Sequence, residues 1–182
     1  MVKNIFITGK PGCGKTTLIK EILKELKLNA GGFYTQEIRE RGKRIGFKIN
    51  SLDGKEGILA HVNIKSPFKV SKYGVNIKDL EEIGVKSILE SLKVKKIVVI
   101  DEVGKMELFS EKFKKAVLKA LNSKNKVLGT IKMTKDFFTD KIKKKDFFTD
   151  KIKKREDVKI FYLQKENREK VKEEIKKFLE NE

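Results

Sequence analysis

Hydrophobic positions along this chain follow two different periods. A short apolar run at residues 2–8 precedes a glycine-rich stretch, and from Lys15 to Leu28 apolar residues return every three or four positions. The first pattern predicts a buried strand, and the second predicts an amphipathic helix that packs by one face. The chain therefore opens with a strand, a loop and a helix.

The same alternation continues along most of the chain. We predict further strands at 96–101, 126–131 and 158–163, and further helices at 79–92, 111–122 and 165–179. Strands that alternate with helices favour a mainly parallel sheet flanked by helices on both faces. The expected fold class is α/β, and the 182 residues fit a single domain, 1–182.

Residues 31–62 depart from this alternation. Apolar and polar residues alternate at 33–35 and 45–49, and the turn signals Arg41-Gly42-Lys43 and Asp53-Gly54 interrupt them. A period of two, broken by glycine-containing turns, predicts antiparallel hairpins. We expect these hairpins to be an insertion that sits on the main sheet.

The sequence KDFFTDKIKK occurs twice in succession at residues 135–154. A solenoid needs at least three longer repeats, so this is not a repeat fold. Helical residues turn by about 100° each, so the Phe pairs of the two copies would point about 80° apart on one straight helix. Both copies cannot line one core stripe, and we predict that the second copy, 145–154, is dispensable for folding and activity.

Several features bear on the location of the protein. The longest apolar run, 97–100, is far too short to span a bilayer, and the N-terminus lacks the pattern of a signal peptide. The one cysteine, Cys13, excludes an intrachain disulfide. These features predict a cytoplasmic protein.

The chain is strongly basic, with 44 Lys and Arg against 26 Asp and Glu and a net charge of +18. Such a charge can collect nucleic acid through phosphate contacts. However, few of the basic residues are arginine, and no recognised DNA- or RNA-binding module is present. A surface rich in Lys and Glu is also typical of hyperthermophile proteins, and we favour that interpretation.

The strongest chemical signal lies where the first strand meets the first helix. Residues 9–16, GKPGCGKT, match the phosphate-binding pattern G-x-x-x-x-G-K-[ST]. Glycines let successive N–H groups turn inward as an anion nest, and the helix N-terminus adds its dipole. We expect Lys15 between the β- and γ-phosphates and the Thr16 hydroxyl at a Mg²⁺ ion. Cys13 is expected to be a small residue that fills the loop.

The second half of the site is predicted at the end of the apolar run 97–100. This run ends in two carboxylates, Asp101 and Glu102. We predict that Asp101 holds Mg²⁺, directly or through water, and that Glu102 orients and deprotonates the attacking water. Lys15 and Glu102 are thus the expected catalytic residues, and Thr16 and Asp101 the expected metal ligands.

Residues 101–104 also fit the D-x-x-G pattern of GTPases. That interpretation needs an Asn-Lys-x-Asp guanine clamp, and the nearest candidate, residues 125–128, reads NKVL without the Asp. Strong selectivity for guanine is therefore not expected.

Taken together, these motifs resemble those of a family of small nucleoside-triphosphatases from thermophilic archaea and bacteria, which also has a vertebrate relative. The matching pieces are GKPGCGKTTL at 9–18, GGFYTQEIRE at 31–40, YGVN at 73–76, IDEVGKMELFS at 100–110, LGTI at 128–131 and KENR at 165–168. They follow one another in family order over nearly the whole chain. The departure lies at 132–155, where relatives have one Pro-containing stretch.

The resemblance implies a RecA-like P-loop core and Mg²⁺-dependent hydrolysis of several nucleoside triphosphates, namely ATP, GTP, CTP and UTP. It also implies nucleotide contacts from two segments. These residues are Gly9, Lys10, Pro11, Gly12, Cys13, Gly14, Lys15, Thr16 and Thr17, and then Val98, Val99, Ile100, Asp101, Glu102, Val103, Gly104 and Lys105.

Two other functions stay open. A nucleotide or small-molecule kinase uses the same phosphate cradle with an acceptor pocket that excludes water, and Arg39, Arg41 and Arg44 are candidates for an acceptor clamp. A carboxylate such as Glu102 suits water activation better, which favours hydrolysis. A nucleic-acid-associated ATPase would use the basic charge.

Two further residues, Arg168 and His61, have no assigned role at the site. Arg168, after the last strand, is a candidate for an approach to the nucleotide. His61, the single histidine, is expected to be structural because its neighbours lack metal-ligand spacing.

Overall fold

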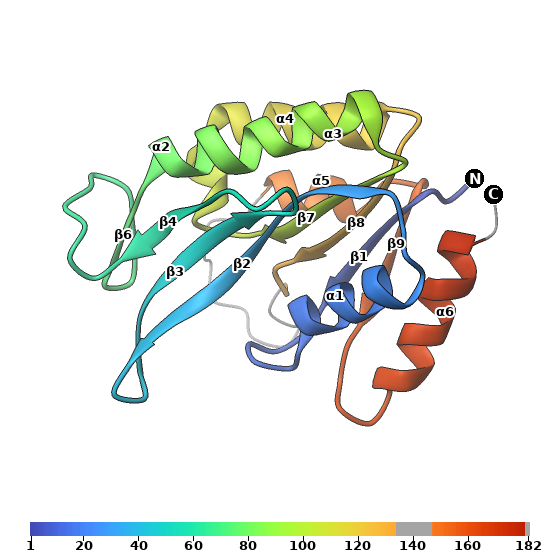
Figure 1. The fold of residues 1–182 in the computed structure, drawn as a ribbon, viewed down its shortest axis with the longest axis horizontal. Coiled ribbons are helices and arrows are strands. Elements are labelled where there is room, and N and C mark those ends of the chain that lie inside the picture. The colour runs from blue at the N-terminus through green and yellow to red at the C-terminus, as the bar shows by residue number, and fades with distance from the viewer. Residues whose placement is uncertain (134–146, 181–182) are drawn as a thin grey trace.

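One mixed sheet organises the molecule. The computed structural model describes residues 1–133 and 147–180. Within them, nine strands lie in the order β5-β6-β4-β3-β2-β7-β8-β1-β9 (Figure 1). The strands are β1 (Asn4–Thr8), β2 (Ala30–Glu40), β3 (Lys43–Ser51), β4 (Glu56–His61), β5 (Lys69–Val70), β6 (Tyr73–Val75), β7 (Ile97–Val103), β8 (Lys126–Ile131) and β9 (Val158–Tyr162).

Helices connect most of the parallel strands. They are α1 (Lys15–Glu25), α2 (Ile77–Asp79), α3 (Lys86–Val94), α4 (Glu111–Asn122), α5 (Phe147–Lys153) and α6 (Arg168–Glu180). A π-helical turn, η1 (Leu80–Val85), joins α2 to α3, and a 3₁₀ turn, η2 (Glu107–Phe109), precedes α4. The predicted helices and strands are confirmed to within a few residues at their ends, whereas β5, β6, α5 and η2 were not predicted.

The parallel half of the sheet confirms the α/β fold class. β2, β7, β8, β1 and β9 are neighbours and run parallel. Helices α3 and α4 cover one face of the sheet, and α1 and α6 lie on the other (Figure 1). Because all these strands run parallel, the segments after β1, β7, β8 and β9 meet at the same carboxyl edge, where ligands bind in open α/β sheets.

The hairpin segment is part of this sheet and does not sit on top of it. The first residues of β2 pair in parallel with β7, with Ala30 opposite Ile97 and Phe33 opposite Ile100. The rest of β2 pairs antiparallel with β3. β2 is therefore long enough to serve both halves of the sheet, and its far end carries the β2–β3 hairpin beyond the carboxyl edge (Figure 1).

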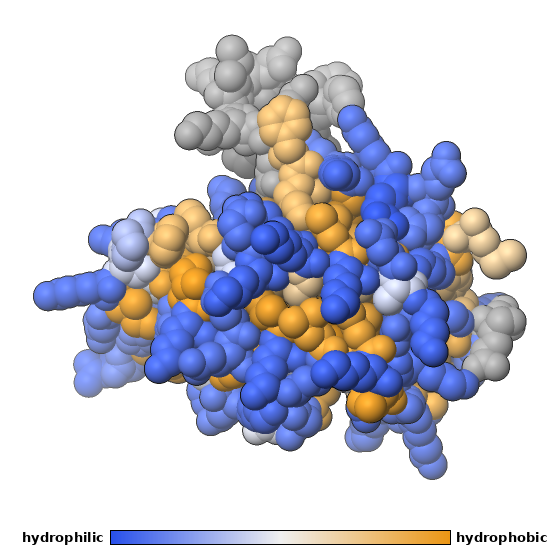
Figure 2. Space-filling view, turned by 90° about the horizontal axis from the view of Figure 1, so that it is seen from above, coloured by the Kyte–Doolittle hydropathy of each residue, from blue (hydrophilic) through white to orange (hydrophobic). Residues whose placement is uncertain are grey.

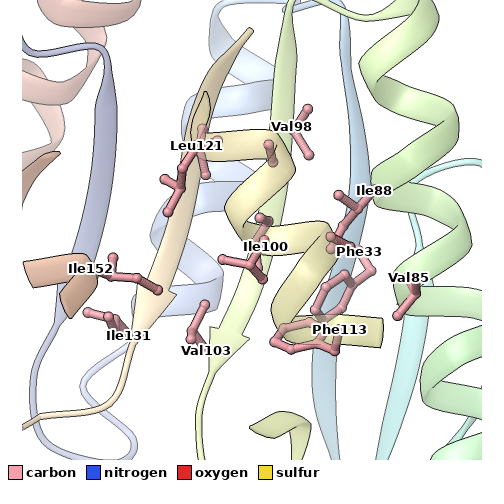
Figure 3. Packing of buried hydrophobic residues seen from close by; sticks show 14 of the residues in the cluster. Phe33, Val85, Ile88, Val98, Ile100, Val103, Phe113, Leu121, Ile131 and Ile152 are labelled. Carbon is pink, nitrogen blue, oxygen red and sulfur yellow. The ribbon is translucent and has the colours of Figure 1, made fainter. Parts of the chain in front are cut away.

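Two hydrophobic clusters hold the layers together, one on each face of the sheet. The larger cluster lies under α3, α4 and α5, where Phe33 and Phe113 meet edge to face with ring centroids 6.0 Å apart (Figure 3). The second cluster joins α1 and α6 to the opposite face. Alternate residues of β7 serve both clusters: Val98 and Ile100 belong to the first and Val99 to the second. A strand buried on both faces explains the continuous apolar run in the sequence.

The second copy of the decapeptide contributes to the core. It forms α5, and its Ile152 is fully buried beside Ile131 of β8 (Figure 3). The second copy, which we predicted to be dispensable, therefore packs into the core in the full chain, because one face of the short helix covers the end of the sheet. The first copy, 135–144, lies outside the described residues.

The face covered by α3 and α4 is mainly hydrophilic, with hydrophobic side chains in the hollows (Figure 2). A shallow cavity of about 510 Å³ on these helices is lined by lysines and glutamates together, among them Lys86, Glu90 and Lys93. Charges of both signs are typical of a solvated surface and do not form a binding stripe for nucleic acid. Over residues 1–133 and 147–180, no helix has the length and hydrophobicity to cross a bilayer.

Candidate functional site

The phosphate-binding loop lies at the carboxyl edge, between β1 and α1. Gly12 and Gly14 adopt left-handed backbone angles, with φ of +77° and +88°. L side chains rarely adopt these angles, so the loop needs glycine at both positions. Gly14 is the N-cap of α1, and the free N–H groups of that helix end therefore face the loop.

Lys15 and Thr16 are the first residues of α1. The Lys15 ammonium donates to the carbonyl oxygens of Gly9 at 3.2 Å and of Lys10 at 3.4 Å, so it lies over the loop. Both residues are half-buried, whereas the next residue, Thr17, is exposed. A fixed cation above a nest of N–H groups is an arrangement suited to a polyphosphate.

Asp101 lies at the carboxyl end of β7 and is almost completely buried, with 1% of its surface exposed. The Thr16 hydroxyl donates to its Oδ2 at 2.6 Å, and the Thr130 hydroxyl donates to its Oδ1 at 2.5 Å. Burial raises the pKa of Asp101, while the two hydroxyl bonds oppose this shift. The fold therefore brings together the two predicted metal ligands, which are 85 positions apart in sequence.

A hydroxyl and a carboxylate in contact fit the ligand preference of Mg²⁺. The ion prefers hard oxygen donors and is usually held by one or two carboxylates together with substrate phosphates and water. In the described part of the chain, no three His, Cys, Asp or Glu side chains gather into a metal cluster. Thr16 and Asp101 suit an ion that arrives with phosphates better than an ion held by protein alone.

Glu102 follows Asp101 and is half-buried. Burial raises its pKa first, the neighbouring Asp101 charge raises it further, and the positive charges of Lys15 and Lys132 oppose both effects. Glu102 therefore lies within electrostatic reach of the loop lysine. A raised pKa makes a carboxylate a stronger proton acceptor, as a general base requires.

The structure divides the predicted segment Val98–Lys105 into two parts. Val98, Val99 and Ile100 have no exposed surface, and their side chains belong to the hydrophobic clusters. Lys105 is exposed beyond the end of the strand. The apolar residues therefore hold the strand in place, and the polar residues after Ile100 form the edge of the site.

Arg168 reaches the loop from the start of α6. Its guanidinium donates to the Gly14 carbonyl oxygen at 3.2 Å and to the Glu21 carboxylate at 3.0 Å. Arg168 was a candidate for an approach to the nucleotide, and the structure places its guanidinium against the phosphate-binding loop. Arg168 ties the last helix to the N-cap of α1.

Two residues at the site were not predicted. Thr130 belongs to the quoted LGTI motif, where a polar residue at the end of an apolar strand was the available signal. Glu107 belongs to the quoted IDEVGKMELFS motif, is 4% exposed, and accepts a hydrogen bond from the Gly104 N–H at 3.1 Å. One acidic residue among many gives no sign in the sequence that it will be buried.

The hairpin arginines have partners of their own. Arg39 and Arg44 both pair with Glu37, at 2.6 Å and 2.7 Å. Arg39 and Arg44 thus share the Glu37 carboxylate within the hairpin, which favours a solvated hairpin face over an acceptor clamp for these two residues. His61 accepts a hydrogen bond from the Asn63 N–H at 3.2 Å, which agrees with a structural role.

The chain is similar over nearly its whole length to known proteins of one family. Residues 4–176 match the family model described as NTPase. The chain is 53% identical over 171 residues to nucleoside-triphosphatase THEP1 of Thermotoga sp. strain RQ2, covering 94% of this chain and 92% of the relative. It is 37% identical over 181 residues to the human cancer-related nucleoside-triphosphatase, covering 92% of each. The crystal structure of THEP1 from Aquifex aeolicus matches with a TM-score of 0.82 and 34% identity, covering 98% of this chain and 99% of that one.

Proposed function

Because this chain belongs to the nucleoside-triphosphatase family and is an enzyme of that class, we propose that it hydrolyses the terminal phosphate bond of several nucleoside triphosphates with Mg²⁺ as cofactor. The observation that carries the proposal is the contact of the Thr16 hydroxyl with the buried Asp101 carboxylate beside the loop lysine. This contact supports a bound ion and a bound polyphosphate at one place.

The P-loop holds the substrate in this proposal. Its N–H groups bind the phosphate oxygens, and Lys15 supplies a positive charge between the β- and γ-phosphates. Thr16 and Asp101 would hold Mg²⁺, which when bound neutralises part of the phosphate charge. Beyond the two carboxylates, Gly104 and Lys105 complete the edge, whereas Val103 is fully buried in the first hydrophobic cluster and holds the strand in place.

Glu102 acts as the general base. Its carboxylate accepts a proton from the attacking water as the water oxygen bonds to the γ-phosphorus, and the bond from that phosphorus to the β–γ bridging oxygen breaks. The products are a nucleoside diphosphate and inorganic phosphate. The raised pKa of Glu102 and its position beside Asp101 support this role.

The proposed substrates are ATP, GTP, CTP and UTP. The nearest candidate for a guanine clamp begins at Asn125, but this residue is 5% exposed and its side-chain amide donates to the Lys95 carbonyl oxygen. The Asn125 side chain therefore has a structural role, because it binds the backbone of the segment between α3 and β7. This supports broad tolerance of the base.

A substitution at the loop lysine tests the proposal directly. Lys15→Ala should remove most nucleoside-triphosphate affinity, because the β/γ charge loses its main protein counter-charge. Binding is measured by calorimetry, and release of phosphate by each of the four nucleotides is measured with and without Mg²⁺. Unchanged affinity in Lys15→Ala would contradict the proposal, and transfer of phosphate to an added acceptor in place of water would favour a kinase.

The location and the domain organisation of the protein stay predictions. The cytoplasmic location is a prediction from the amino-acid composition, with its single Cys13. The organisation as one domain, 1–182, is supported by a single sheet that runs through the described residues.

A further inference from the structure

Glu107 is a buried carboxyl group that the proposed hydrolysis does not use. It begins η2, directly after the turn that follows the two carboxylates of β7. Only 4% of its surface is exposed, and its Oε2 accepts a hydrogen bond from the Gly104 N–H at 3.1 Å. The side chain therefore reaches back across the turn and binds its backbone.

The Glu107 and Glu102 side chains lie close together beside Gly104. A Cβ atom at Gly104 would lie 2.8 Å from Glu102 Oε1 and 3.1 Å from Glu107 Oε2. The two carboxyl groups thus border the same small space, and only glycine leaves that space free. Any movement of the turn would change the position of the Glu102 carboxyl group.

The charge state of Glu107 is compatible with this closeness. Burial first, and the negative charges of Glu102 and Asp101 next, raise the pKa of Glu107 to about 8. Hydrogen bonds with the Gly104 backbone and with its own oppose this shift only in part. At neutral pH Glu107 therefore holds a proton, accepts the backbone N–H through a neutral carboxyl group, and adds no second negative charge beside Glu102.

We propose that Glu107 is a positioning residue for hydrolysis, which braces the turn that begins at Gly104, directly after β7, and so holds the nearby Glu102 carboxylate in place for the attacking water. The inference rests on the proposed function. The Glu107 side chain bonds to the Gly104 backbone and not to a phosphate-binding group of the P-loop. It should therefore affect the turnover number and leave nucleotide affinity nearly unchanged.

Three substitutions at this position test the inference. Glu107→Gln keeps an oxygen for the Gly104 N–H without a charge, so kcat should stay within about threefold of the parent value. Glu107→Ala removes the brace, and kcat should fall about 10- to 100-fold, since a misplacement of about 1 Å can cost that much. Glu107→Asp is one methylene shorter, cannot reach the turn, and should resemble the alanine variant. KM and the nucleotide Kd should change by less than about twofold in all three.

Thermal melting of each variant shows whether it is folded. A parent-like kcat in Glu107→Ala would overturn the inference. A Glu107→Gln variant as slow as the alanine variant would overturn it also, because the carboxyl group itself, and not an oxygen that accepts the Gly104 N–H, would then be needed. If Glu107→Ala does not fold, the contrast between Glu107→Gln and Glu107→Asp decides the matter in the same way.

The proposed function is tested separately. Phosphate release by the parent and its loss in Lys15→Ala establish hydrolysis without reference to Glu107. If the parent releases no phosphate, the proposed function fails. If the parent is active and all three Glu107 variants match it, only the positioning role fails.

Discussion

At the residue scale, Asp101 and Glu102 differ in their surroundings although they are adjacent in sequence. Asp101 is closed off from water and already accepts two hydroxyl hydrogen bonds, whereas Glu102 is only half-buried. This difference in surroundings suits the two adjacent carboxylates to different proposed roles, metal binding by Asp101 and proton acceptance by Glu102.

Glu102→Gln should separate binding from chemistry. The amide keeps the size of the side chain but cannot accept the proton of water, so kcat should fall by about 10²- to 10⁴-fold while nucleotide affinity stays nearly unchanged. Asp101→Asn should weaken both, because it loosens the proposed metal site. Single-turnover kinetics and equilibrium binding measure the two effects.

An exposed glutamate provides the matched control for that comparison. Glu56 lies on β4, pairs with Lys48 and has 64% of its side chain exposed, so Glu56→Gln should change neither quantity. Hydrolysis by Glu102→Gln at close to the parent rate would mean that water is activated elsewhere.

Glu107 should make stability depend on pH. Its pKa is raised from 4.5 to about 8 in the folded protein, so between these values the folded state keeps a proton that the unfolded state loses. The sign is therefore a loss of stability as pH rises from about 4.5 to about 8, of about 3–5 kcal/mol at most. Over this range the free energy of unfolding of Glu107→Gln, measured without metal, should rise relative to that of the parent as pH increases. A difference that is constant from pH 5 to pH 8 would contradict the prediction.

At the element scale, the first turn of α1 is held from two sides. Asp101 of β7 accepts from Thr16, and Arg168 of α6 donates to Gly14 while pairing with Glu21. The strand and the last helix are far from the loop in sequence. Their contacts restrict the loop and so prepare it for phosphate before any substrate is present.

The doubled decapeptide makes an element-scale prediction. Deleting 145–154 or deleting 135–144 gives one and the same sequence, because the copies are identical. The remaining copy can form α5, and surface loop length costs little entropy. The deletion variant should therefore keep cooperative unfolding and the hydrolysis rate, measured by calorimetry and phosphate release.

A pair of point substitutions shows which copy serves the core. Ile152 is fully buried, so Ile152→Ala in the full chain should lower the free energy of unfolding by about 2–5 kcal/mol. The equivalent Ile142→Ala, in the copy outside the described residues, is the matched control and should cost less. Equal losses in the two variants would mean that the copies exchange at the α5 position.

At the scale of the whole molecule, the parallel strand ends gather the site, and residues 125–128 lack the Asp that a guanine clamp requires. Rates on ATP and GTP should therefore lie within about tenfold of each other, or about 1.4 kcal/mol. A turnover panel with the four common nucleotides measures this ratio. A thousandfold preference would reveal a base pocket that the described residues do not suggest.

Residues close together in the sequence were enough to predict the P-loop, the two carboxylates and the elements of the parallel half of the sheet. The P-loop can be recognised because its glycines, lysine and threonine act as consecutive residues, and their spacing is set by one turn between a strand and a helix. Two carboxylates after a run buried on both faces are recognisable for the same reason. The helices and strands of the parallel half followed from hydrophobic period alone, since each buries a face or a whole strand.

Only the tertiary structure decided which distant residues join them. Thr130 meets Asp101 across 29 positions and Arg168 meets Gly14 across 154, and the pairing of β2 with β7 made the hairpins a continuation of the sheet. Glu107 is ordinary in sequence and becomes unusual through burial beside Glu102. Of two identical decapeptides, the second supplies α5. These outcomes depend on strand order and on desolvation in a shared interior, which are properties of the assembled layers and are not encoded at any single position.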